Sequence, residues 1–121
     1  MTHEELEEKL NTAEEQKNTG KYEEAERLCK EVLSALEEGH SHLLQERKIR
    51  VFALRLLADS VRRLGRATDA LSIAEAALSL AIQADEKSHA AKTMNIIGLA
   101  YWNLSDYPRA LEHYQKALAI S

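Results

Sequence analysis

Apolar residues recur along this chain at the three- and four-residue spacing of amphipathic helices, in six successive stretches. Short polar segments with glycine, serine or aspartate separate most of these stretches, and none shows the strict alternation that is typical of a strand. The pattern predicts helices over residues 3–18, 22–38, 42–64, 67–83, 86–104 and 106–120. The predicted fold class is therefore all-α.

Capping residues and glycines mark the ends of these predicted helices. Thr2 and Glu5 form a capping box at the start of the first helix. Glycine adopts the left-handed backbone that ends many helices, and three glycines are expected to do so here: Gly20, Gly39 and Gly65. Polar side chains are expected to cap the last two helices: Asp85 for the fifth, and Ser105 with Asp106 for the sixth.

The turn between paired helices occurs three times with one pattern. Three hexapeptides align: Gly20-Lys21-Tyr22-Glu23-Glu24-Ala25, Gly65-Arg66-Ala67-Thr68-Asp69-Ala70 and Ser105-Asp106-Tyr107-Pro108-Arg109-Ala110. The turns lie 45 and then 40 residues apart, and the alignment continues without gaps into the following helix. The chain is therefore predicted to be one domain of three helix-turn-helix units, over about 3–38, 42–83 and 86–120.

The third unit resembles a tetratricopeptide repeat nearly position for position. The matching residues are Met94, Ile97, Gly98, Tyr101, Asp106, Tyr107, Ala110, Tyr114 and Ala117. The second unit keeps the small residues Ala58 and Ala70 but has Ala67 where the family usually has an aromatic residue. The first unit departs most, with polar residues at three positions where larger apolar ones are expected: Lys9, Thr12 and Gln16.

The period of 40 to 45 residues exceeds the family's usual length of about 34. It resembles the longer-repeat branch that occurs in kinesin light chains, cell-polarity adaptors and bacterial signalling proteins. This resemblance implies a right-handed α-solenoid of six helices, with a concave face built from the first helix of each unit.

Carried onto this sequence, the resemblance places a mixed set of side chains on the concave face. The candidates for peptide binding are Phe52, Arg55, Asp59, Arg62, Lys92, Asn95, Leu99, Trp102 and Asn103. Cations can hold carboxylates, amides can hold a peptide backbone, and a desolvated tryptophan is a common binding hot spot. The resemblance thus implies a non-enzymatic scaffold for an acidic or amphipathic segment, as the sensor or adaptor part of a signalling protein.

Two alternatives stay open. The basic residues of the concave face can instead pair with the acidic first unit, through Glu7 and Glu14. The domain can also be a self-association module that dimerises an attached effector. A stripe on the last predicted helix, formed by Leu111, Tyr114 and Leu118, would pack against a further unit in a longer array. We therefore expect a fragment of a longer protein, or a homodimer through the C-terminal helix.

Composition and charge narrow the class of partner. The chain has 121 residues, 45% of them apolar, and a formal net charge of −4. Its length suits a single domain with its own core, and no apolar run approaches a membrane span. Seven basic residues lie within positions 47–66, but the overall negative charge disfavours nucleic acid. The single cysteine excludes a disulfide framework and favours a reducing, cytoplasmic setting.

Candidate chemistry is sparse. The sequence contains no glycine-rich phosphate loop, no Cys-x-x-Cys, no His-Glu-x-x-His and no Gly-x-Ser-x-Gly, so we expect neither an enzyme nor a cofactor. His40 and His42 have no cysteine or carboxylate at ligand spacing, and we expect loop histidines rather than a metal site. Cys29 falls on the seam between helices and is interpreted as a small buried residue.

Overall fold

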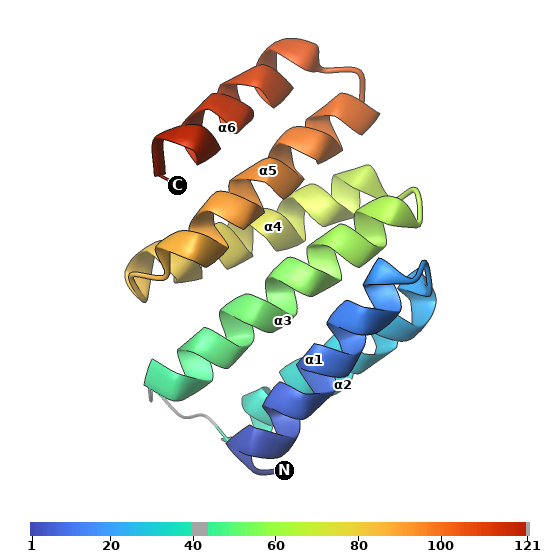
Figure 1. Cartoon of the computed structure of the whole chain (residues 1–121), viewed down its shortest axis with the longest axis vertical. Coiled ribbons are helices and arrows are strands. Elements are labelled where there is room, and N and C mark those ends of the chain that lie inside the picture. Colours follow the sequence, from blue (N-terminus) through green and yellow to red (C-terminus); the bar gives the residue numbers. More distant parts are fainter. Residues whose placement is uncertain (40–43, 121) are drawn as a thin grey trace.

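The computed structural model describes residues 1–39 and 44–120, and every regular element in these ranges is an α-helix. The helices are α1 (His3–Asn18), α2 (Tyr22–Gly39), α3 (Leu44–Arg63), α4 (Ala67–Gln83), α5 (Lys87–Asn103) and α6 (Tyr107–Ile120). They pack as successive pairs, from α1 and α2 beside the N-terminus to α5 and α6 at the other end (Figure 1). The predicted all-α solenoid of helix pairs is confirmed, with helix ends that differ from the prediction by a residue or two.

The contacts between helices define an inner and an outer layer. Each helix contacts the next one along the chain, and in addition α1 contacts α3 and α3 contacts α5. Within the described residues, α2, α4 and α6 do not contact one another in this way. The first helices of the three units therefore form the continuous, concave side of the solenoid, as the resemblance implies.

Small residues let the paired helices approach closely. Ala13 and Ala25 are buried in the first unit, Ala58 and Ala70 in the second, and Ala110 in the third. The backbones of two helices can come together at such positions because no long side chain separates them. In the third unit the ring of Tyr114 lies over Gly98, where a Cβ atom would be 2.6 Å from a ring carbon.

The turns show where the backbone needs a left-handed residue. Gly20 and Gly65 have φ angles of +85° and +87° between the paired helices, which confirms their predicted role. Asp85 and Ser105 take the same conformation at the next two turns, with φ angles of 55° and 63°. Their prediction as caps was wrong because each residue occupies the left-handed turn position before the helix.

The caps themselves lie one residue later in the chain. Glu86 is the N-cap of α5 and makes no side-chain cap hydrogen bond. The Oδ1 atom of Asp106 accepts from the backbone N–H of Arg109 at 3.3 Å, so the predicted cap of α6 rests on Asp106 alone. Thr2 is confirmed as the N-cap of α1 by a 3.1 Å bond from the Glu5 N–H to the Thr2 Oγ1, and the Thr2 hydroxyl also bonds the Glu5 carboxylate at 3.2 Å.

Candidate functional site

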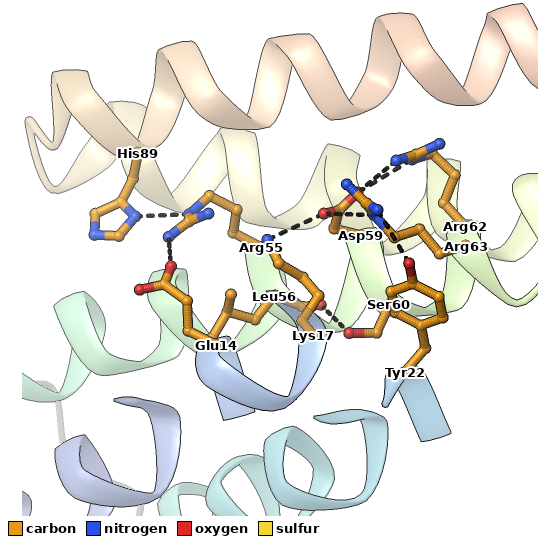
Figure 2. Close-up of polar contacts among 10 residues, drawn as sticks. All are labelled: Glu14, Lys17, Tyr22, Arg55, Leu56, Asp59, Ser60, Arg62, Arg63 and His89. Carbon is orange, nitrogen blue, oxygen red and sulfur yellow. Dashed lines mark hydrogen bonds and ion pairs between the residues drawn. The ribbon is translucent and has the colours of Figure 1, made fainter. Parts of the chain in front are cut away.

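Arg55 joins the three first helices on the concave side. From α3, its Nε donates to Nδ1 of His89 on α5 at 3.1 Å, and its Nη2 lies 3.4 Å from Oε2 of Glu14 on α1 (Figure 2). The guanidinium also lies 5.4 Å from the centre of the Phe52 ring. The side chain of Arg55 is buried, so its positive charge needs partners within the protein, and these contacts supply them.

His89 acts as the hydrogen-bond acceptor in this arrangement. Burial lowers the pKa of His89, and the positive charge of Arg55 lowers it further. The neutral imidazole can accept at Nδ1, whereas a protonated ring would place a second cation against the guanidinium. The contact with Arg55 therefore favours neutral His89.

Asp59 is the centre of a second cluster, one helical turn along α3. Its buried carboxylate contacts Lys17 at 3.1 Å, Arg62 at 2.9 Å and Arg63 at 3.4 Å (Figure 2). Burial by itself would raise the pKa of Asp59, but Lys17 and Arg62 together outweigh it and hold the pKa below its ordinary value. A single carboxylate is thus shared among three cations.

Three of the predicted site residues make ion pairs and hydrogen bonds within the protein. Arg55, Asp59 and Arg62 do lie together on the concave side, but their charges are used inside the protein. Arg55 and Asp59 are buried, and Arg62 contacts both Asp59 and the Oδ1 of Asn103, the latter at 3.2 Å. Arg55 pairs with Glu14 of the first unit, as the alternative interpretation expects, and Asp59 pairs with Lys17 of the same unit. Arg55 and Asp59 are therefore buried and join helices of different units, and their role in peptide binding stays a prediction.

The other predicted residues differ in exposure. Four are exposed: Lys92, Asn95, Trp102 and Asn103. Trp102 has 55% of its surface exposed and packs edge-on against the ring of Tyr107, with centroids 4.6 Å apart. Leu99 is partly buried, and so is Phe52, which contacts the ring of His89. The accessible part of the predicted site therefore lies on α5.

A cleft of about 770 Å³ opens where the helix turns of the three units meet. We call it the turn-edge cleft; its principal lining residues are Tyr22, Arg62, Arg63, Arg66, Leu99 and Asn103. Arg63 donates to the hydroxyl of Tyr22 at 3.2 Å, and Arg66 donates to both carboxylate oxygens of Glu26 at 2.7 Å. These contacts join α2 to α3 and to the turn before α4, and the contact of Arg62 with Asn103 adds α5.

Sequence reasoning missed Tyr22 and Arg66 of this cleft, because it considered only the first helix of each unit. Tyr22 opens α2, and Arg66 lies in the turn before α4. The signal that could have found Arg66 was the group of basic residues running into the turn at Gly65.

A second cleft lies farther along α5. It has a volume of about 450 Å³ and is lined by residues that include Lys92, Asn95 and Leu118. Lys92, Asn95, Leu99 and Asn103 follow one another at intervals of three and four, so they share one face of α5. That face borders both clefts.

Metal and thiol chemistry find little support in the described part of the chain. Residues 1–39 and 44–120 contain no group of three His, Cys, Asp or Glu side chains placed to hold a metal ion. His40 and His42 lie outside the described residues. Burial raises the pKa of Cys29 to about 12, so its thiol stays protonated at neutral pH.

None of the described helices is both long and apolar enough to span a membrane.

The fold and the face of α5 define a helical-repeat protein, and comparison with known proteins gives its family. The tetratricopeptide-repeat family profile matches residues 50–121, more than half of the chain. The chain therefore belongs to the tetratricopeptide-repeat family. A protein of this fold is a scaffold for protein–protein interaction and is typically non-catalytic.

A solved structure supports the same fold over the whole chain. The TPR domain of Arabidopsis FLU superposes with a TM-score of 0.81 at 23% sequence identity, and the match covers 96% of this chain and 93% of that one. The comparison with curated proteins gives no match. The structural likeness extends to the first unit, which the family profile does not reach.

Proposed function

We propose that this domain binds an acidic or amphipathic segment of another protein along the exposed face of α5. The observation that carries the proposal is that Lys92 and Asn95 border one cleft while Leu99 and Asn103 border the other. This arrangement offers a cation, two amides and an apolar side chain in one row. In the cell, the domain would be the cytoplasmic sensor or adaptor part of a signalling protein.

The dimensions of this face suit a short segment. Helical residues rise about 1.5 Å each, so Lys92 and Asn103 are roughly 16 Å apart along α5. An extended chain covers about 3.3 Å per residue, and about five residues would span this length. Trp102 lies at the end of the row nearest the helix turn, where its exposed ring can cover an apolar side chain of the segment.

A peptide-array screen followed by titration tests the proposal. Trp102 is the only tryptophan, so its fluorescence reports binding directly in the unmodified protein. We expect Trp102→Ala, followed by anisotropy of a labelled array peptide, to weaken binding by about 2 kcal/mol because an aromatic anchor that the bound segment covers is lost. Lys92→Ala should weaken it less and should reduce the salt dependence.

Lys116→Ala is the matched control, since Lys116 is an exposed lysine on α6 and lines neither of the two clefts. It should leave the affinity unchanged. An array that yields no binding peptide, or a peptide bound equally by all three variants, would contradict a site on α5.

A second candidate function is self-association through α6. Leu111 and Leu118 are 58% and 75% exposed, and Tyr107 at the start of the same helix is exposed and packs against Trp102. Tyr114, the third residue of the predicted stripe, is turned toward Gly98 of α5. A second copy of the chain would cover Leu111 and Leu118 from outside.

A further inference from the structure

The turn-edge cleft has a local surplus of positive charge. Its lining carries three arginines, Arg62, Arg63 and Arg66, and one carboxylate, Asp69. Behind the lining, Asp59 is shared by Arg62, Arg63 and Lys17, and Glu26 is shared by Arg66 and Lys30. The chain as a whole carries a net charge of −4, so this surplus is a local property of the cleft. An anionic group placed there would be attracted by more than one guanidinium.

Two of these cations are accessible to a ligand. The side chains of Arg63 and Arg66 are 42% and 44% exposed. Within the described residues, Arg63 uses Nε and Nη1 for Asp59 and Tyr22, and Arg66 uses only Nη2 for Glu26. A guanidinium carries five N–H donors, which leaves Nη2 of Arg63 and both Nη1 and Nε of Arg66 to bind an acceptor.

The remaining lining limits the ligand to a small anion beside an apolar group. Asp69 lies in the wall of the cleft, and Glu26 lies behind Arg66, so a long polyanion would meet negative charge as well as positive. Leu99, Leu104 and the ring of Tyr22 supply apolar surface in the same wall. A single carboxylate next to an apolar side chain matches both features.

We propose that the turn-edge cleft binds a carboxylate of the partner segment through Arg63 and Arg66, with the neighbouring apolar side chain against Leu99. This inference rests on the proposed function, because it names the chemistry of one end of the segment that lies along α5. The carboxylate belongs to a glutamate or aspartate side chain or to the C-terminus of the segment.

Amide chemical-shift titrations of the 121-residue chain with three blocked dipeptides test the inference. The probes are acetyl-Leu-Glu-amide, its neutral analogue acetyl-Leu-Gln-amide, and acetyl-Gln-Leu with a free C-terminus. We expect a carboxylate probe to shift the amides of Thr68, Leu99 and Asn103, and the neutral probe to leave them in place. Which of the two carboxylate probes binds more tightly distinguishes a side chain from a C-terminus.

Variants separate binding from folding. Arg66→Gln removes an exposed charge and should weaken the better carboxylate probe about tenfold, the loss of one charge-assisted contact. Arg63→Lys keeps the charge that faces Asp59, retains the fold, and should weaken the probe through lost N–H geometry. Arg109→Gln removes a comparably exposed arginine on α6 and should change nothing.

Several results would overturn the inference. Equal shifts with the glutamate and glutamine probes would show that charge is not recognised, and unchanged binding by Arg66→Gln would exclude that side chain. Tighter binding of inorganic phosphate than of either carboxylate would assign the cleft to a different anion. Chemical-shift changes confined to Lys92 and Asn95 would exclude the turn-edge cleft as the carboxylate site and would leave the proposed function in place.

Discussion

Several charged side chains on the concave side of this domain form ion pairs with one another in the absence of a partner. Asp59 illustrates this, because it is a buried carboxylate that holds Lys17 and Arg62 together. Removing one partner of such a buried cluster leaves charges with neither water nor a counter-ion. The concave face is therefore sensitive to single substitutions even where no ligand is bound.

The first prediction concerns Asp59. Asp59→Asn keeps the size of the side chain but removes its charge, and we expect it to lower the free energy of unfolding by about 3–5 kcal/mol. Urea denaturation followed by circular dichroism measures this loss. Asp69→Asn, at an exposed aspartate, should change stability by less than about 0.5 kcal/mol. Similar values for the two variants would show that the Asp59 cluster contributes little.

The second prediction concerns the pH dependence due to His89. Arg55 from α3, Glu14 from α1, Lys92 from α5 and the N-cap residue Glu86 act on this imidazole, and burial with Arg55 sets the direction. The pKa of His89 lies below its ordinary 6.5 in the folded chain, so the unfolded chain binds the proton first as the pH falls. The stabilising contribution is complete above pH 6.5 and is lost progressively below it.

His89→Gln provides the comparison, since its amide oxygen can still accept from Arg55. Between pH 7.5 and pH 5.5, the parent should lose more of its free energy of unfolding than His89→Gln does. Equal losses in urea titrations at the two pH values would mean that His89 is not the responsible group.

At the scale of single elements, local patterns fixed most of the helices in advance. Gly20 and Gly65 were predictable as turns because glycine reaches positive φ without strain. Asp85 and Ser105 take that conformation with a side chain present, at a cost of about 1 kcal/mol. Because aspartate and serine are typical capping residues, their residue types predicted caps rather than left-handed turn positions. A turn position held by a non-glycine residue carries little local signal.

The candidate site was predictable only in part, for a related reason. The helical register placed Arg55 and Trp102 on the correct elements. Whether Arg55 meets a ligand or Glu14 depends on the spacing of helices that lie 41 residues apart in the chain, which no local pattern encodes. The contribution of Tyr22 and Arg66 to a cleft depends in the same way on how the three turns stack.

The third prediction concerns the packing of α5 against α6. In Gly98→Ala, the new methyl group would meet the ring of Tyr114 at 2.6 Å. Overpacking costs about 1–3 kcal/mol, and the better helix propensity of alanine recovers up to about 1 kcal/mol. We expect a net loss of about 1–2 kcal/mol in the free energy of unfolding, measured by urea denaturation.

A smaller side chain at Tyr114 provides the control. In a Tyr114→Leu background, Gly98→Ala should become nearly neutral because the ring that it would meet is gone. A loss of the same size in both backgrounds would show that Tyr114 is not the constraint.

At the scale of the whole molecule, the exposed apolar side chains of α6 make the oligomeric state a direct question. If two copies associate through this helix, Leu111→Glu should weaken the dimer by more than about tenfold, since burial of a leucine contributes about 1.5–3 kcal/mol. Analytical ultracentrifugation over a range of concentrations measures this change. The melting temperature of the dissociated chain should stay the same, because Leu111 is mostly exposed.

Lys116→Gln changes the net charge by the same amount at an exposed residue outside the row of Leu111 and Leu118, and should leave association intact. A parent chain that stays monomeric at high concentration would contradict self-association through α6.

The contacts of Arg55 also have a consequence for how this repeat array unfolds. In an array where each unit contacts only its neighbours, the end units can fray independently of each other. Arg55 lies in the middle unit and holds Glu14 of the first and His89 of the third at the same guanidinium. Detachment of either end unit would therefore disturb a contact of the other. Amide hydrogen exchange should accordingly show α1 and α5 opening together, as one cooperative unit, and separately once Arg55 is replaced.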